Sequence, residues 1–424
     1  MKIYFVVLDG AADRKTKELG NQTPLEYAQT PILDLLAKKG CQSMISVIDE
    51  NIAPESDSGT MALLSYDPLI YYPGRGTLEG SGAGFLEKYK YSASFRINFA
   101  SYNENEQILD RRTARGLSDA ELQKLAEELR ENIKFEEKDD LEFKLLAFGH
   151  HRGILSLLSN TTQLCGNVSN TDPGFEKRGC FSFPLSNYEN KPKICRPLEN
   201  SNAARMTAYY VNCFMEQAKR ILDLSEVNYI RRKKGLLPAN CILVRDGGSL
   251  PVKMPLFYDK YACSLVMYGQ LPSEKAIADL IGADFVYTKA LELQFDEEYL
   301  QKIAECLIED GHDIKYIHLK GPDEPGHDKV PFEKVKAIEK IDTFFMQELF
   351  QGMKSEDIVI VTCDHATPCE LGIHSSDKVP LLIYGNGILA DSSEKFSEEE
   401  AGSGSGTITR AIDILPFLKF NSNR

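Results

Sequence analysis

The sequence predicts an α/β protein with a doubly wound, mostly parallel sheet and an inserted α+β domain. Near both ends of the chain, short apolar runs alternate with helical stretches, which is typical of parallel strands joined by crossover helices. The middle differs, with short alternating strands, a highly charged helix and a loop-rich segment. A chain of 424 residues is long enough for both domains.

The N-terminal segment is predicted to run strand, helix, helix, strand. Residues 2–8 are, apart from Lys2, apolar and mostly β-branched or aromatic, as in a buried strand. Thr-Pro pairs at 23–24 and 30–31 each predict a helix start, since Thr is a good N-cap and Pro suits the first helical position. The second helix is expected to stop at Gly40, before a strand at residues 42–48.

The C-terminal part continues the alternation. Helices are expected near residues 296–310 and 331–353. The apolar runs predicted to be strands are residues 285–288, 316–319, 357–362 and 379–383. In such a sheet, ligands bind at the carboxyl ends of the strands.

The middle of the chain is predicted to be a separate domain. Its expected elements are strands at 95–100 and 143–147, helices at 118–132 and 202–222, and a loop at 165–202. We therefore expect a core domain of residues 1–85 plus 246–424. Residues 86–245 are expected to form an inserted substrate-binding cap.

Composition limits the class of partner. The net charge is −14 and the sequence pI is near 5.2, which argues against nucleic acid and anionic membranes. No apolar run approaches the roughly 18 residues of a membrane span. The ten cysteines include no CxxC pair, so reduced thiols in the cytoplasm are expected. The expected partner is a small molecule, and the oligomeric state stays open.

Three side chains with metal-binding chemistry lie close together near the C-terminus. Asp364 and His365 directly follow an apolar run, and His374 comes nine residues after His365. Asp9 ends the first predicted strand, where a lone Asp-Gly would ordinarily be a turn. Because the carboxyl ends of parallel strands share one edge of the sheet, these side chains are expected to converge.

A further pair, Asp323 and His327, follows the strand predicted at residues 316–319. Pro325 and Gly326 lie between them, which favours a tight loop over a helix. The candidates form two three-ligand sets, Asp323, His327 and His374 in one, and Asp9, Asp364 and His365 in the other. Each set leaves a coordination position open, as catalytic metals require. Mixed oxygen and nitrogen ligands suit Mn²⁺ or Zn²⁺ better than Ca²⁺.

Ser56, Ser58 and Thr60 lie at the start of an expected helix. Ser56 could simply cap that helix, a common role for serine. The same position has a positive local field that suits phosphate, where a metal would make the hydroxyl a nucleophile. The residues alone leave both interpretations open.

Seven stretches together give a resemblance that covers nearly the whole chain. They are VVLDGAADR, LGNQTPLEYAQTPILDLLAKKG, SDSGTMALLSYDP, YYPGRGTLEGSGAG, DRRTARGLS, KGPDEPGHD and CDHATP. In this order they resemble the alkaline-phosphatase superfamily and, more narrowly, the archaeal-type cofactor-independent phosphoglycerate mutases. The resemblance implies an alkaline-phosphatase-like core. It also implies interconversion of 3- and 2-phosphoglycerate through a phosphoserine, without bisphosphoglycerate.

The resemblance also implies roles for individual residues. Ser56 matches the phosphoacceptor, with Ser58 as the alternative. Ser56 joins Asp9, Asp364 and His365 as ligands of one ion, and Asp323, His327 and His374 hold the other. Mn²⁺ is expected, with Mg²⁺, Zn²⁺ or Co²⁺ as alternatives. Lys260 is expected near the transferred phosphate, and the expected substrate contacts are Arg111, Arg112, Arg115, Arg152, Asp172 and Arg245.

Two features depart from the family pattern. Glu55 precedes the serine where the archaeal enzymes commonly have glycine. It motivates an alternative function, a related phosphotransferase or phosphatase with another small hydroxyl acceptor, for example a homoserine-kinase-like activity. The loop at 165–202 is longer than expected, and its Cys165, Cys180 and Cys195 are interpreted as structural.

Overall fold

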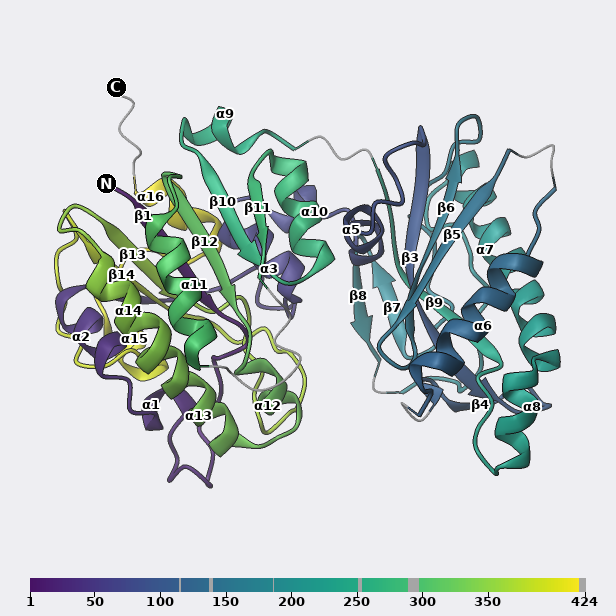
Figure 1. Cartoon of the computed structure of the whole chain (residues 1–424), viewed down its shortest axis with the longest axis horizontal. Coiled ribbons are helices and arrows are strands. Elements are labelled where there is room, and N and C mark those ends of the chain that lie inside the picture. Colours follow the sequence, from purple (N-terminus) through teal and green to yellow (C-terminus); the bar gives the residue numbers. More distant parts are fainter. Residues whose placement is uncertain (114–115, 137–139, 186, 251–253, 289–296, 419–424) are drawn as a thin grey trace. The chain divides into compact units, whose positions relative to one another are not determined.

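The computed structural model describes the 424 residues apart from 114–115, 137–139, 186, 251–253, 289–296 and 419–424 (Figure 1). The chain divides into two compact units, residues 1–72 with 254–424, and residues 73–253. The expected boundaries fell after residues 85 and 245. Helix α5 (Arg75–Gly82), which we expected in the core domain, packs on strands of the second unit. A Cβ on its Gly76 would lie 2.6 Å from Phe95 Cα, so this close contact requires glycine.

The first unit is built on a seven-stranded sheet in the order β11-β10-β12-β1-β13-β14-β2. Only β14 runs against its neighbours among the described strands; the other pairings are parallel. The strands are β1 Ile3–Leu8, β2 Cys41–Ile45, β10 Leu265–Gly269, β11 Asp284–Tyr287, β12 Ile314–Leu319, β13 Ile358–Thr362 and β14 Val379–Gly385. The expected mostly parallel α/β core is confirmed.

Helices cover both faces of this sheet. On one face, the hydroxyls of Tyr316 and of Thr60 in α3 form a hydrogen bond of 3.0 Å. On the other face, the Lys315 ammonium donates to the Ile308 carbonyl of α11. The helices are α1 Pro24–Tyr27, α2 Pro31–Lys39, α3 Ser56–Leu63, α4 Pro68–Tyr71, α9 Phe257–Tyr261, α10 Pro272–Ile281, α11 Glu297–Glu309, α12 Asp323–His327, α13 Pro331–Lys340, the π-helical η3 Ile341–Met346, α14 Gln347–Gly352, α15 Glu398–Ser403, the 3-10 turn η4 Ala411–Asp413 and α16 Ile414–Phe417. Figure 1 shows α11, α13 and α14 along the same side of the sheet.

The second unit contains a five-stranded antiparallel sheet and a β-hairpin. Helices α6 and α7 pack on the sheet with a continuous apolar core. Its elements besides α5 are β3 Tyr91–Tyr102, β4 Ile108–Asp110, α6 Asp119–Asn132, β5 Glu142–Phe148, β6 Arg152–Ser159, β7 Phe175–Arg178, β8 Phe181–Pro184, α7 Asn202–Leu224, α8 Glu226–Lys233 and β9 Cys241–Leu250. This is the α+β domain that the sequence predicts.

Two predictions about local structure were wrong. The segment with Asp323 and His327 is helix α12, because Pro325 lies in its first turn, where a missing N–H costs no intrahelical hydrogen bond. The loop at 165–202 contains the hairpin β7–β8. The Lys177 ammonium anchors this hairpin by donating to the carbonyls of Gly166 and Gly247, both 2.5 Å away.

Glu398, at the start of α15, gives a prediction for stability against pH. Its carboxylate accepts from the Asp13 N–H and the Thr23 hydroxyl, and burial raises its pKa to about 7. The folded state therefore binds the carboxyl proton of Glu398 more tightly than the unfolded state does. This difference stabilises the folded state at low pH, and the stabilisation is lost as pH rises from about 4.5 to 7. Glu398→Gln is expected to reduce the fall in the free energy of unfolding between pH 5 and pH 8 by on the order of 2–3 kcal/mol. Urea unfolding at pH 5 and pH 8 measures the free energy of unfolding of both proteins. An equal fall in the variant and in the unaltered protein would contradict the prediction.

No helix among the described residues is long and apolar enough to span a membrane.

Candidate metal and phosphate site

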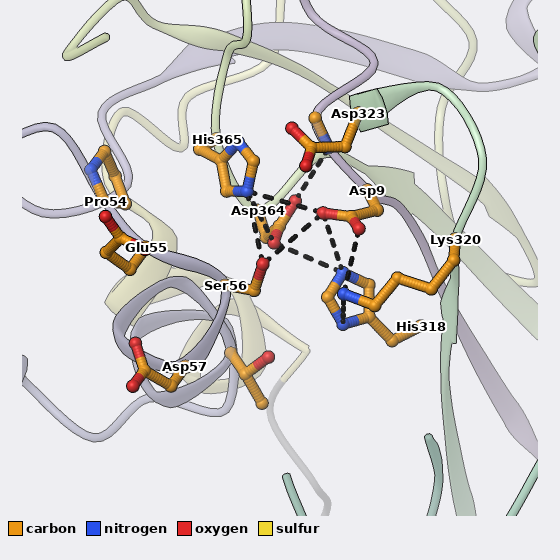
Figure 2. A network of polar contacts seen from close by, with 12 residues as sticks. Asp9, Pro54, Glu55, Ser56, Asp57, His318, Lys320, Asp323, Asp364 and His365 are labelled. Carbon is orange, nitrogen blue, oxygen red and sulfur yellow. Dashed lines mark hydrogen bonds and ion pairs between the residues drawn. The ribbon is translucent and has the colours of Figure 1, made fainter. Parts of the chain in front are cut away.

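The carboxyl ends of three adjacent strands supply the centre of the site. Asp9 follows β1, Lys320 follows β12, and Asp364 comes two residues after β13. One carboxylate oxygen of Asp364, Oδ1, accepts from the Gly10 N–H at 3.1 Å, which joins two of these strand ends. The convergence expected from the sequence is present (Figure 2).

The first cluster consists of Asp9, Asp364 and His365, whose ligand atoms lie within 4.8 Å of one another. All three side chains are buried. The Nε2 atom of His365 is 3.4 Å from Asp9 Oδ1 and 3.3 Å from Asp364 Oδ2. Asp364 Oδ2 is buried and accepts no hydrogen bond from the described residues. A buried carboxylate oxygen without a hydrogen-bond donor, surrounded by a second carboxylate and an imidazole, fits a cation.

The second cluster lies around Asp323. Asp323, His365 and His374 also present ligand atoms within 4.8 Å of one another, so His365 belongs to both clusters. His327 lies beside them, with its Nε2 atom 3.3 Å from Asp323 Oδ2 and 3.1 Å from His374 Nε2. The six carboxylate and imidazole side chains expected as ligands therefore lie in or beside these two clusters.

The three imidazoles are oriented in the same way. Each Nδ1 atom is bound to an oxygen, that of His365 to the Thr367 hydroxyl, that of His374 to the Pro54 carbonyl and that of His327 to the Gly372 carbonyl, all at 3.0 Å. The Nε2 atoms thus face the clusters. Metal-binding histidines commonly have this arrangement, since the second hydrogen bond fixes tautomer and ring orientation.

Neighbouring charged groups shift the pKa values of side chains in the two clusters. Burial alone would raise the pKa of Asp9, but Lys320 and His318 lower it well below its usual range. Burial lowers the pKa of His374, yet the hydrogen bond with Asp323 outweighs it and the value rises to about 9. Asp9 is therefore ionised at neutral pH, the form that binds cations, whereas His374 must lose its proton to bind one.

Ser56 is the first residue of α3, and the preceding Glu55 takes the N-cap position that Ser56 was considered for. The hydroxyl of Ser56 lies 3.3 Å from His365 Nε2 and 3.5 Å from Asp9 Oδ1. The Ser58 hydroxyl instead bonds to the main chain of Glu55, donating to its carbonyl. Helix α3 approaches the first cluster so closely that a Cβ on Gly59 would lie 2.5 Å from the Asp364 carbonyl oxygen. Figure 2 shows the Ser56 side chain directed toward Asp9, Asp364 and His365, whereas the hydrogen bonds of the Ser58 hydroxyl are to the main chain.

Three residues at the site were not predicted from the sequence, namely Glu274, His318 and Lys320. The Lys320 ammonium is 2.8 Å from Asp9 Oδ2, and His318 Nε2 is 3.2 Å from Asp364 Oδ2. Glu274, from α10, accepts from His318 Nδ1. The available signal was weak, because His318 and Lys320 flank the strand end that also leads to Asp323.

Lys260 does not join this group. Its ammonium donates to the Ser65 carbonyl, beyond the C-terminal end of α3, and lies over the Tyr66 ring. The eight residues of α3 span about 12 Å at 1.5 Å each, and Ser56 is at the opposite end. Lys320 is the described lysine nearest to the carboxylates of the first cluster.

The expected substrate residues lie in the second unit. Arg152 has four arginines as neighbours, and partial burial together with these charges lowers its pKa to about 10. It forms no ion pair among the described residues. The four neighbours are Arg75, Arg96, Arg112 and Arg245. Arg75, Arg96 and Arg245 pair with Glu79 or Asp246, so the arginines are only partly compensated. The remaining positive charge suits an anion.

The other expected substrate contacts differ in their surroundings. Arg111 pairs with Asp172 through two hydrogen bonds of 2.8 Å, and its guanidinium lies over the Phe175 ring. Both side chains therefore already have partners. Arg245 pairs with Asp246 and also lies over Phe175. Arg115 lies outside the described residues.

A serine hydroxyl at a helix N-terminus beside two carboxylate–imidazole clusters is typical of enzymes that transfer phosphoryl groups with two divalent cations. A family model described as 2,3-bisphosphoglycerate-independent phosphoglycerate mutase matches residues 37–228. Relatives of that name from Aeropyrum pernix and Pyrococcus furiosus are 38% and 34% identical. The first alignment covers 98% of each chain, and the second covers 100% of this chain and 98% of the relative. The chain therefore belongs to the family of 2,3-bisphosphoglycerate-independent phosphoglycerate mutases, as the resemblance indicated.

Solved structures agree with this assignment. A Pyrococcus horikoshii protein matches with a TM-score of 0.78 and 27% identity, covering 98% of this chain and 96% of that one. The cofactor-independent phosphoglycerate mutase from Thermoplasma acidophilum matches with a TM-score of 0.63 and 27% identity over 98% of both chains. Enzymes of this family are metal-dependent with a two-metal site, which fits the two clusters.

Proposed function

We propose that the protein interconverts 3-phosphoglycerate and 2-phosphoglycerate through a phosphoserine at Ser56, without bisphosphoglycerate. The observation that carries the proposal is the position of the Ser56 hydroxyl, 3.3 Å from His365 and 3.5 Å from Asp9, where both clusters meet. Family membership supplies the substrate. The proposed ligands are those expected from the sequence, Asp9, Ser56, Asp364 and His365 for one cation and Asp323, His327 and His374 for the other. Mn²⁺ is the proposed metal.

When bound, the two cations favour loss of the serine proton and stabilise charge on the transferred phosphoryl group. The Ser56 oxygen attacks the phosphorus of 3-phosphoglycerate in line, forming the Oγ–P bond as the bond to the 3-oxygen breaks. That oxygen takes up a proton in place of the one lost from serine. Glycerate then turns within the site, and its 2-hydroxyl attacks the phosphoserine, which restores free Ser56.

The second unit contributes recognition in this proposal. Phosphoglycerate carries a carboxylate and a phosphate, and arginine binds both well through paired N–H donors. Arg152 is the best candidate because it has no described carboxylate partner, in contrast to Arg111 and Arg245. Arg111 and Asp172 are proposed to shape the site, since each satisfies the other.

The test is conversion of 3-phosphoglycerate to 2-phosphoglycerate by chelator-treated protein, with and without added Mn²⁺ and without bisphosphoglycerate. Metal-dependent turnover is expected. Release of inorganic phosphate alone would indicate a phosphatase. Failure of the metal-loaded, folded protein to turn over this substrate would overturn the proposal and favour another hydroxyl acceptor.

Arg152→Ala is expected to lower kcat/KM roughly 10- to 100-fold, mainly through KM, because a charged hydrogen bond contributes about 1.5–3 kcal/mol. The control is Arg220→Ala, which removes an exposed arginine of the same unit that pairs with Glu216 on α7. Steady-state kinetics of both variants provide the measurement. Equal kinetics for the two variants would exclude Arg152 from substrate binding.

A further inference from the structure

Glu274, His318 and Lys320 form a polar group behind the first cluster that the proposed reaction does not use. His318 and Glu274 are fully buried, and the Lys320 side chain is 18% exposed. The His318 ring lies between carboxylates, with Nδ1 2.5 Å from Glu274 Oε1 and Nε2 3.2 Å from Asp364 Oδ2. The Lys320 ammonium is 2.8 Å from Asp9 Oδ2 and 3.8 Å from Glu274 Oε1.

Glu274 is itself held rigidly. Its second oxygen, Oε2, accepts from the N–H groups of Gln270 and Leu271, at 2.7 and 2.8 Å, where β10 leads into α10. One oxygen is thus fixed by the main chain, so the other presents a fixed acceptor to His318 and Lys320. A series of contacts therefore runs from the main chain through Glu274 and Lys320 to Asp9.

The two oxygens of Asp9 consequently face different groups. Oδ1 lies 3.5 Å from the Ser56 hydroxyl and 3.4 Å from His365 Nε2, whereas Oδ2 lies against Lys320 (Figure 2). A carboxylate held through one oxygen is restricted to offering the other, so it binds a cation through a single oxygen. Lysine suits this task because its ammonium is a compact charge with several donors.

We propose that Lys320 is a positioning residue for phosphoryl transfer, holding Asp9 so that only Oδ1 faces Ser56 and the first cluster. It also supplies a fixed positive charge among Asp9, Asp364 and Glu274, three carboxylates that would otherwise repel one another in the metal-free protein. The reaction it serves rests on the proposed function. Its effect on the carboxylates and on bound metal does not depend on which substrate is used.

The test compares Lys320→Met with Lys320→Arg and with Lys315→Met. Lys315 is a matched control, a buried lysine of β12, the strand that Lys320 follows, and its ammonium donates to the Ile308 carbonyl on the face of the sheet opposite α3. Three quantities are measured for each full-length variant: Tm without metal, Tm with saturating Mn²⁺, and the visible absorption of the Co²⁺-loaded protein.

Lys320→Met is expected to lower Tm more without metal than with it, because Mn²⁺ replaces the lost positive charge. Its Co²⁺ spectrum is expected to change, since Asp9 gains freedom to bind through both oxygens. Lys320→Arg keeps the charge and should restore both readouts at least in part, while Lys315→Met should lower both Tm values equally. In mutase assays, kcat of Lys320→Met should fall about 10- to 100-fold, with KM within about twofold.

Equal loss of Tm with and without metal, together with an unchanged Co²⁺ spectrum, would overturn the proposal. If Lys320→Met fails to fold, the same comparison is made with Lys320→Gln, a shorter polar side chain that also removes the charge. A Co²⁺ spectrum identical to that of the unaltered protein then overturns it. Absence of mutase activity in the unaltered protein would refute the proposed function while leaving these metal readouts intact.

Discussion

Ser56→Ala is expected to lower kcat at least about 10⁴-fold, because the variant lacks the only atom proposed to accept the phosphoryl group. Metal binding should largely persist, since the carboxylates and imidazoles of both clusters are unaltered. The measurement is 3-phosphoglycerate turnover, with mass spectrometry of protein quenched during turnover to find the phosphorylated peptide. That peptide should contain Ser56 in the unaltered protein and be absent from the variant.

Ser58→Ala is the matched control for this experiment. Its hydroxyl bonds to the main chain of Glu55, so the loss should cost about 1 kcal/mol of stability and less than about tenfold in kcat. Turnover that survives Ser56→Ala but not Ser58→Ala would transfer the nucleophile to Ser58.

Asp364→Asn is expected to remove the cation of the first cluster and lower kcat on the order of 10³-fold. The amide can still accept from the Gly10 N–H through its oxygen, but it replaces the buried Oδ2, which accepts no hydrogen bond from the described residues, with a neutral donor that repels cations. Metal content after dialysis, measured by plasma mass spectrometry, should fall by one Mn²⁺ per chain. Chelation of the unaltered protein should abolish turnover, and added Mn²⁺ should restore it.

Asp377→Asn provides the comparison, since this carboxylate pairs with Arg14 near the surface and lies outside both clusters. It should keep its metal content and turnover. Full metal occupancy in Asp364→Asn would show that the cation does not depend on this carboxylate.

The strand-end residues could be predicted because their signal is local. An apolar run followed by Asp364-His365 identifies both a buried strand and the edge where it ends, and parallel strands bring such edges together. Glu274 gives no comparable signal, since it lies in an amphipathic helix and reaches the site only because α10 packs against β10, β11 and α3. His318, inside the apolar run of β12, has the sequence context of an ordinary core histidine.

Three other differences have similar causes. The five residues of β10 were not predicted as a strand, because the hydrophobic periodicity of so short an apolar run does not distinguish a strand from a helix. Lys260 was assigned by resemblance, and its ammonium instead reaches Ser65 because α9 packs at the far end of α3. Helix α5 was placed in the wrong domain since its glycines gave no indication of which sheet they approach. Contacts between distant segments decide all three cases.

The three cluster histidines have a consequence for how the protein acquires its metal. Because each ring is anchored through Nδ1 to Pro54, Gly372 or Thr367, none can turn over without breaking a hydrogen bond. The ligands are therefore already oriented for a cation, which can enter or leave without refolding of the chain. Divalent ions of similar size should exchange readily at a site with such rigidly held ligands. The metal used in a cell would then follow the local supply of each ion more than any selectivity of the protein.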